Sequence, residues 1–430
     1  MKTPYRTLLN LIAVYLLTQQ ASAFTLDQAW QAALQYNSDQ AAAQAERDAG
    51  LQQRAKGLAP LLPQVSLNGS YQHLMPESPE PTTNVISRQY QLTLRQTLFD
   101  LARFAGYQKG QYSADLANIR FEINQQQRYV DVAQTYYNVL QAQDTLAATQ
   151  ASQKAYVNQL QQARLALETG LGTQIEVYEA EASVNGAEAK AIVDQNLLEI
   201  HRQTLHQLTG LNPLEIQPIT IDARAPDTTL QEWQDQAASH NLNIKAAELM
   251  LHIAESDLTA SRSGHLPTVT FEASNGESHS NERNWLSGPA QPKRENRVGV
   301  QIHIPIFNGG GVRAQVLESA SLKEAARYKL ESSKRQTRED VRKAYLNVAS
   351  GAQQIRAQEQ LVKSAKSKLE STQLGKEVGI RTQLEVLQAE REGYEALTSL
   401  AAAKYGYLNA WVQLRIHSGN SLLILPALMQ

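Results

Sequence analysis

The chain alternates between two hydrophobic patterns, and the same succession of patterns occurs in both halves. The first segment carries apolar side chains at helical spacing, after a capping box that begins at Thr25. We expect one helix that ends before Pro60, because proline lacks the N–H group that a continuing helix needs. The second half opens in the same way at Thr229, with Trp233 in the place of Trp30.

After each of these helices the hydrophobic period falls to two, which is typical of strands. Apolar and polar residues then alternate in four segments, near residues 64–73, 90–99, 268–274 and 297–306. Strands with one apolar and one polar side suit a membrane β-barrel that has a wet lumen. The alternative is a pair of half-buried hairpins on a soluble sheet.

Long polar helices follow each pair of strands. Residues 101 to about 168 contain no proline, and neither do residues 312 to about 374. At 1.5 Å per residue each helix spans roughly 90–100 Å. Their apolar residues recur at about seven-residue spacing, which predicts coiled-coil packing of several helices in a wall. We therefore expect a mainly α fold with a small β part.

Each long helix ends in a glycine turn, and the two turns are near copies. Residues 169–181 read TGLGTQIEVYEAE, and residues 377–390 read EVGIRTQLEVLQAE. The matching pairs are Gly170 and Gly379, Thr173 and Thr382, and Glu176 and Glu385. Each glycine supplies a reversal, and each threonine with the glutamate three residues on predicts a new helix start. The sequence thus predicts two long helical hairpins with similar tips.

The order of these elements divides the chain into a leader and two repeats. Residues 1–23 have a basic start, a short apolar run and an Ala-Ser-Ala cleavage site, as in a secretory signal peptide. We expect a first structural repeat over 24–226 and a second over 227–430, each with a helix, two strands and a long hairpin. The chain has no cysteine, so disulfides are excluded.

Composition and motifs give no indication of catalysis. The formal charge of −2 gives no indication of a nucleic-acid partner. The nine histidines are scattered, and no metalloprotease, nucleotide-binding or serine-nucleophile motif is present. We therefore expect no enzyme, no catalytic residues, no metal site and no cofactor.

The four predicted strands are too few to close a barrel in one chain, since the smallest single-chain barrels have about eight. An open sheet in lipid would leave the N–H and C=O groups of its edges unpaired, at several kcal/mol each. The sheet must therefore close between chains, which predicts an oligomer.

An ordered set of motifs resembles the TolC family of outer-membrane export channels. They are PLLPQ at 60–64, HLP at 265–267, IPIFNGG at 304–310 and the two hairpin turns. The resemblance implies a homotrimer in the outer membrane of a Gram-negative cell. Three chains of four strands would form a twelve-stranded barrel, and the helices would continue it as a periplasmic tunnel.

The resemblance also implies partners and a function. A periplasmic adaptor protein and an inner-membrane transporter of the ABC, RND or MFS type would dock at the inner end. The channel would export proteins by type I secretion, drugs and small toxic compounds, or both; the sequence does not identify the cargo. The alternative is a secreted coiled-coil interaction protein with soluble β-hairpins.

Site residues follow from the resemblance, position by position. Adaptor contact is implied for the tip residues Gly170, Leu171, Thr173, Gly379, Arg381 and Thr382. A gate at the inner mouth is implied for Arg381 with Glu176 of a neighbouring hairpin, and for Glu385 in a ring of acidic side chains. Two positions depart from the family: Lys376 replaces the gate tyrosine, and Gln388 replaces a second acidic residue. The alternatives are plain helix reversals at the tips and a solvated helix face at Glu385.

Overall fold

The computed structural model describes residues 24–74, 85–212, 216–281, 283–284, 288–289 and 291–419. The predicted signal peptide lies outside these residues, and the repeat boundaries at 226 and 227 stay a prediction. Contacts divide the chain into two units, each built from both halves. One unit comprises the described parts of 1–43, 123–241 and 335–430, and the other comprises those of 44–122 and 242–334.

The second unit contains a four-stranded antiparallel sheet, in the order β1-β2-β3-β6. Its strands are β1 (Gln64–Leu74), β2 (Val85–Phe99), β3 (Thr268–Ser280) and β6 (Lys293–His303), and a separate pair is formed by β4 (Arg283–Asn284) and β5 (Gly288–Pro289). All four strands extend beyond the predicted ranges at one end, and the last begins at Lys293 but ends at His303 instead of residue 306. The earlier end agrees with Pro305, which has no N–H group to donate to a neighbouring strand.

The register places apolar residues on one face of this sheet and polar residues on the other. Leu94 lies opposite Val65 on one side and Ala273 on the other, and Ala273 lies opposite Val298. On the other face a guanidinium nitrogen of Arg95 lies 3.4 Å from the carboxylate of Glu272, its partner in register. The predicted alternation is therefore present, and β1 and β6 form the open edges.

The helices of this unit are α3 (Ser38–Leu58, from residue 44), the start of α4 (Leu101–Glu168), α7 (Leu242–Arg262) and the start of α8 (Gly311–Glu377). Short 3₁₀ turns, Ala59–Leu61 and Ser263–His265, lead into the strands. Ion pairs join the helices: Lys109 lies 2.8 Å from Asp257, and Lys323 lies 3.1 Å from Glu255. At Gly110 a Cβ atom would lie 2.5 Å from the carbonyl oxygen of Gln53, so glycine permits the close approach of α3 and α4.

The first unit holds the main hydrophobic core. Its elements are α2 (Leu26–Tyr36), α5 (Gln174–Thr209), α6 (Leu230–His240), α9 (Gln383–His417) and the later parts of α4 and α8. Tyr136 is 1% exposed, and its hydroxyl lies 3.0 Å from the carbonyl oxygens of both Phe24 and Gln217. Tyr136 of α4 thus holds two segments against the core: the start of the described chain at Phe24, and the connection after α5 at Gln217.

The capping boxes at Thr25 and Thr229 are confirmed, but the single helix expected up to Pro60 is wrong. It breaks at Asn37, whose φ of −79° and ψ of 119° are extended, and α3 begins at the next residue. The same break recurs at Asn241 between α6 and α7. An asparagine side chain can bond the nearby backbone in place of the helix, which favours a break at these positions.

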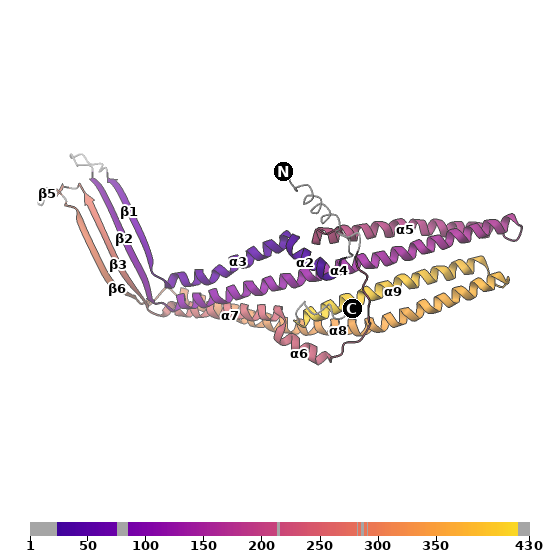
Figure 1. Ribbon diagram of the computed structural model, residues 1–430. Coiled ribbons are helices and arrows are strands. Elements are labelled where there is room, and N and C mark those ends of the chain that lie inside the picture. The colour runs from indigo at the N-terminus through magenta and orange to yellow at the C-terminus, as the bar shows by residue number, and fades with distance from the viewer. Residues whose placement is uncertain are drawn as a thin grey trace, which may run out of the picture. The chain divides into compact units, whose positions relative to one another are not determined.

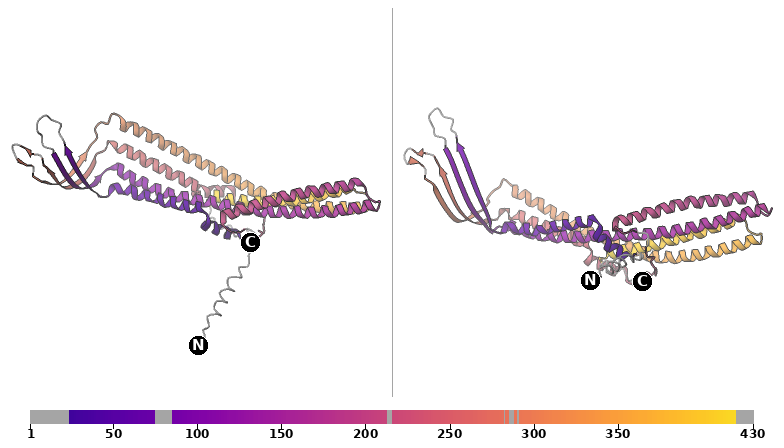
Figure 2. Two further views of the ribbon diagram at one scale, coloured as in Figure 1. Left: turned by 90° about the horizontal axis from the view of Figure 1, so that it is seen from above. Right: turned by 45° about the horizontal axis from the view of Figure 1, so that its top comes forward.

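Two long helical hairpins run alongside each other in the first unit (Figures 1 and 2). One is formed by α4 and α5, and the other by α8 and α9. With 68 residues, α4 is about 100 Å long. Among the described residues no helix is both long and apolar enough to cross a bilayer. The predicted class, mainly α with a small β part, is confirmed.

Candidate functional site at the hairpin tips

The two tips are built from the same backbone motif. In the first, the N–H of Gly170 bonds the Leu167 carbonyl at 3.1 Å, and that of Leu171 bonds the Ala166 carbonyl at 2.8 Å. In the second, Gly379 and Ile380 make the corresponding bonds to Lys376 and Gly375, at 3.0 and 2.9 Å. The φ angles of the two glycines are +73° and +79°. This is the Schellman end of a helix, in which the left-handed position favours glycine.

Each returning helix begins with the predicted capping box. The Thr173 N–H donates to the carboxylate of Glu176 at 2.7 Å, and the Thr382 N–H donates to Glu385 at 2.8 Å. Both threonine hydroxyls accept a bond from the N–H of their glutamate. The prediction of two helix starts is confirmed. Glu176 and Glu385 therefore each cap the N-terminus of a helix.

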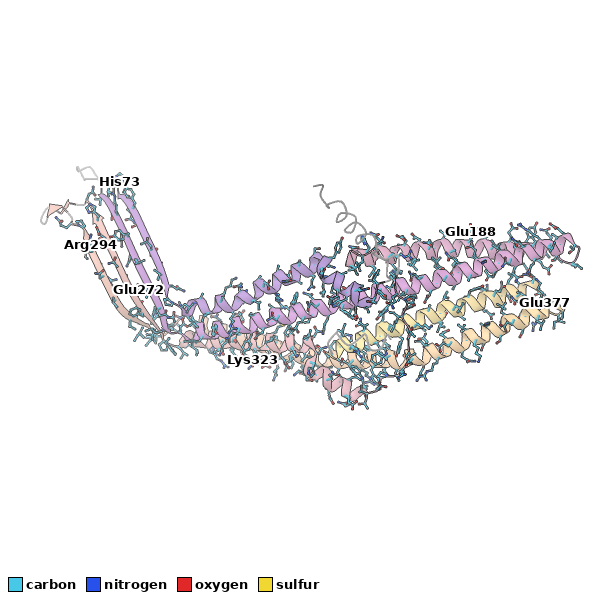
Figure 3. All side chains as sticks on the ribbon, in the orientation of Figure 1. His73, Glu188, Glu272, Arg294, Lys323 and Glu377 are labelled. Carbon is cyan, nitrogen blue, oxygen red and sulfur yellow. The ribbon has the colours of Figure 1, made fainter. Side chains whose placement is uncertain are left out.

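Charged side chains gather at the second tip. Arg381 Nη1 lies 2.6 Å from Glu385 Oε1. The pKa of Glu385 is lowered mainly by the hydrogen bond from the Thr382 N–H and next by the bond from the Arg381 guanidinium. Lys376 donates to the side-chain oxygen of Gln383, and Figure 3 places Glu377, the last residue of α8, at this end of the hairpin. Glu385 is thus held as a carboxylate at neutral pH.

Within one chain the predicted partners of the gate are not joined. In the described part, Arg381 pairs with Glu385, while Glu176 bonds to Thr173. The expected contact involves a neighbouring hairpin, so it stays a prediction. Gln388 is exposed and borders a groove of about 460 Å³ between α9 and the first hairpin.

Sequence reasoning missed a buried polar chain that ties the two hairpins together. Gln383 is 2% exposed and donates to the side-chain oxygen of Gln159 on α4 at 2.9 Å. Gln159 in turn donates to the carboxylate of Glu390 at 3.2 Å. Burial raises the pKa of Glu390, an effect that Gln159 and Lys376 oppose. A signal was available, because Gln383 and Glu390 are seven residues apart and share the face that carries Val386 and Leu387.

The tips also present apolar side chains to solvent. Leu171 is 88% exposed and Ile380 is 76% exposed. They occupy equivalent positions, directly after the two left-handed glycines. A Cβ atom at Gly170 or Gly379 would meet no atom within 4 Å, so the tip surface is open.

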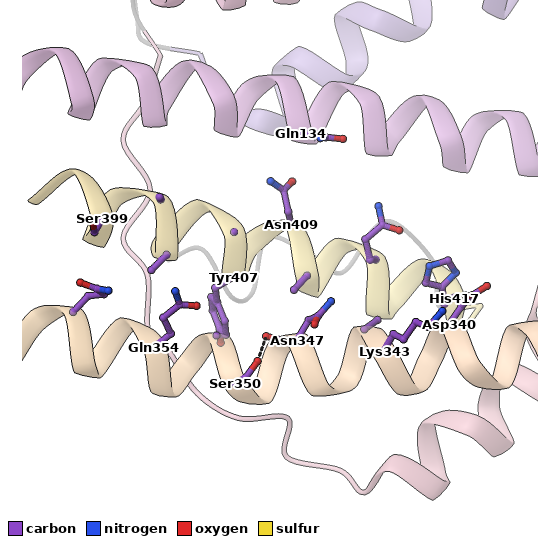
Figure 4. A pocket seen from close by; sticks show the side chains of 18 residues that line it. Gln134, Asp340, Lys343, Asn347, Ser350, Gln354, Ser399, Tyr407, Asn409 and His417 are labelled. Atoms are coloured by element: carbon purple, nitrogen blue, oxygen red, sulfur yellow. Dashed lines mark hydrogen bonds between the residues drawn. The ribbon is translucent and has the colours of Figure 1, made fainter. Parts of the chain in front are cut away.

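A second groove, of about 800 Å³, lies between α8 and α9, beside the hydrophobic core of the first unit (Figure 4). Neutral amides and small residues dominate its lining, among them Gln134, Asn347 and Asn409. Its acidic and basic lining residues are Asp340, Lys343 and His417, and burial lowers the pKa of His417. Among the described residues no three His, Asp or Glu side chains form a metal-binding group. This groove provides a polar surface without a catalytic constellation.

Comparison with known proteins identifies the fold and the family. The family model described as outer membrane efflux protein matches residues 29–211 and 233–420. The chain belongs to the outer membrane efflux protein family. It is 32% identical to the proteases secretion protein PrtF of Dickeya chrysanthemi, over 93% of this chain and 89% of that one. It is 31% identical to the alkaline protease secretion protein AprF of Pseudomonas aeruginosa, over 94% and 86%.

A solved structure shares the fold at low sequence identity. The outer membrane protein VceC of Vibrio cholerae gives a TM-score of 0.81 at 17% identity, with 92% of this chain and 96% of that one covered. Together with the family model and the relatives above, this likeness confirms the resemblance to TolC-like channels. The chain is an outer-membrane export channel that extends into the periplasm, and its four strands are part of a trimeric barrel. Channels of this family work with periplasmic adaptors and inner-membrane transporters.

Proposed function

We propose that this channel exports proteins by type I secretion, with a secreted protease as the first cargo class to test. One observation carries the proposal: two relatives, PrtF at 32% identity and AprF at 31%, are both named for protease secretion, and each matches more than 90% of this chain. Type I secretion needs an inner-membrane transporter of the ABC type and an adaptor besides the channel. The chain itself acts as a passage and not as an enzyme.

Within this function the hairpin tips are the contact with the adaptor. The surface in question comprises Gly170, Leu171 and Thr173 of the first tip and Gly379, Arg381 and Thr382 of the second. Its support is geometric, because both tips expose a large aliphatic side chain on a fixed Schellman turn. Such side chains supply the buried anchors of protein interfaces when a partner covers them.

The gate of the channel is assigned to Arg381, Glu385 and Glu176, with Lys376 and Gln388 beside them. The short Arg381–Glu385 contact and the low pKa of Glu385 support a persistent charge at the second tip. Three carboxylates around a threefold axis would concentrate cations in the passage. Gln388 lacks a charge, so we expect this cation preference to be modest.

A reconstituted secretion assay tests the cargo. A Gram-negative host without its own type I outer-membrane channel receives this chain, an ABC transporter, its adaptor and their protease. We expect protease in the medium only when all components are present, with a periplasmic marker enzyme as the control for leakage. Restored drug resistance without protease secretion would contradict the proposal and would assign the channel to small-molecule efflux.

A further inference from the structure

A groove of about 560 Å³ lies in the second unit, at the junction where the sheet gives way to α8. Arg262 and His265 border it from the end of α7 and the 3₁₀ turn. Phe307, Arg313 and Leu317 border it from the turn after β6 and the first residues of α8. None of its lining residues carries a carboxylate. The groove therefore combines positive charge with apolar surface.

The apolar part of this groove continues the lipid-facing side of the sheet. Every second residue from Val298 to Ile306 is aliphatic and exposed, and the series ends beside Phe307, which is 83% exposed. The nine residues of this series are within the length of about 9–11 residues that a tilted strand needs to cross a bilayer. Aromatic side chains are typical of the end of such a band. The groove thus lies at the level of the periplasmic bilayer surface.

Within the described part of the chain, the two arginine side chains at this groove have no acidic partner. Arg262 and Arg313 are exposed, and neither side chain forms an ion pair or hydrogen bond with another described residue. The first half of the chain differs at the same junction. There Arg103 lies 3.1 Å from the Asp100 carboxylate and donates to the Pro60 carbonyl at 2.9 Å.

The sequence explains this difference. Phe99 ends β2 and Asp100 follows it, while Phe307-Asn308 occupies the corresponding place after β6. Asparagine replaces the carboxylate that neutralises the arginine in the first half. An arginine pair without a counter-ion, next to exposed aliphatic and aromatic groups, complements a phosphate that carries acyl chains.

We propose that this groove binds the headgroup of an anionic phospholipid of the inner leaflet of the outer membrane. Arg262 and Arg313 hold the phosphate, and an acyl chain lies along Phe307 and the aliphatic stripe that ends at Ile306. The lipid belongs to the channel's seating in the membrane and is separate from its cargo. The proposal rests on the assignment as an outer-membrane channel and is independent of what is exported.

Lipid binding to the purified trimer tests this site. Native mass spectrometry in detergent compares retention of phosphatidylglycerol with that of zwitterionic phosphatidylcholine. A basic side chain near an anionic headgroup contributes roughly fivefold in affinity. We therefore expect about a fivefold loss for Arg262→Gln or Arg313→Gln, and roughly thirtyfold for both together.

The matched control is Lys329→Gln, the same change of charge at an exposed site about 24 Å further along α8. It should leave phosphatidylglycerol retention within about twofold of the unmodified chain. Equal retention of the two lipids by the unmodified trimer, or unchanged binding by the double variant, would overturn the proposal. Gel electrophoresis in SDS shows whether the double variant still forms trimers. Loss of these trimers in the presence of either lipid would overturn the proposal too, because it would mean that a neighbouring subunit covers the groove. Protease secretion by the double variant is measured in parallel. A failure of the lipid site is thereby distinguished from a failure of the export assignment.

Discussion

The two hairpin tips share a backbone but differ in what holds their side chains. Both close with a left-handed glycine and restart with a threonine capping box. Around the first, Leu171 and Ile175 are exposed, and the side chains of Thr169, Thr173 and Glu176 bond only to groups of their own tip. Around the second, Arg381 bonds Glu385, Lys376 bonds Gln383, and Gln383 is fastened to the other hairpin through Gln159. The two turns thus share their backbone, while in the described part of the chain the polar network around Gln159 involves residues of the second returning helix, Gln383 and Glu390.

This difference suggests that the two tips have different roles, the first in contact with a partner and the second in gating. An open apolar surface on a rigid turn suits contact with a partner, whereas a charged and cross-linked tip suits an element with two positions. Such a gate needs only a few kcal/mol between its closed and open states, which several weak polar contacts can supply. Three changes, in order of expected effect, test whether the division holds.

The largest effect is expected at the apolar tip. Leu171→Asp should lower protein export at least tenfold, because burying a leucine is worth about 1.5–3 kcal/mol and each trimer carries three copies. Site-specific cross-linking of the tip to the adaptor, together with the secretion assay, measures the effect. Ile380→Asp should lower export less if the second tip serves mainly as the gate. Equal losses at both sites would break the proposed distinction.

The control for this experiment keeps the turn and alters only the glycine. Gly170→Asn places a residue that tolerates a left-handed φ in open space, so export should stay near normal. Gly170→Val has the same open space but a costly φ, so it should disturb docking through the backbone. Normal cross-linking in Leu171→Asp would remove this surface from the adaptor contact.

A middle-sized effect is expected at the charged tip. Arg381→Ser should raise single-channel conductance in planar bilayers severalfold, because an exposed pair contributes about 0–1 kcal/mol and occurs three times per trimer. Two double variants then identify the partner of Arg381. Coupling with Glu385→Gln would assign the gate contact to the pair seen within one chain, and coupling with Glu176→Gln would assign it to neighbouring hairpins.

Glu385→Gln also reports on ion selectivity. The carboxylate has a lowered pKa, so it is charged at neutral pH and attracts cations. The variant should show a smaller cation preference and weaker block by divalent cations. Unchanged conductance after both Arg381→Ser and Glu176→Gln would mean that other contacts close the mouth, and Lys376 would be the next to test.

The sequence predicted the repeated, local features of this chain best. Capping boxes and left-handed glycines depend on residues three to six apart, so the pattern alone was enough to place Thr173, Gly170 and their copies. The alternation of the strands was equally local. The break at Asn37 was missed, because helical apolar spacing continues on both sides of it.

Contacts between distant segments could not be predicted in the same way. The bond between Gln159 and Gln383 joins residues 224 positions apart, and neither glutamine differs in type from many on the surface. Arg262 and Arg313 border the same groove only because the end of α7 lies next to the start of α8, which is also a contact between distant segments. The resemblance to a family supplied the trimer and the partners, which no pattern within a single chain specifies beyond the need to close the sheet.

The smallest effect is expected from the carboxylate inside the polar chain. Glu390 is 4% exposed, and burial raises its pKa above the ordinary 4.5. Below pH 4.5 the group is neutral in both the folded and the unfolded chain, so it imposes no penalty. Above pH 4.5 the unfolded chain loses the proton more readily, and the stability of the fold falls until the pH passes the folded pKa.

Replacing Glu390 by Gln removes this dependence while keeping an oxygen for Gln159. The variant should melt at a higher temperature than the unmodified chain near pH 7, and this gain should shrink as the pH falls toward 4. Thermal unfolding followed by circular dichroism across this range measures the difference. Glu392→Gln is the matched control, because Glu392 is an exposed carboxylate 2.6 Å from Lys368 on the neighbouring helix. A lower melting temperature for Glu390→Gln at neutral pH would contradict this prediction, and would show that the charge of the buried carboxylate, opposite Lys376, stabilises the second tip.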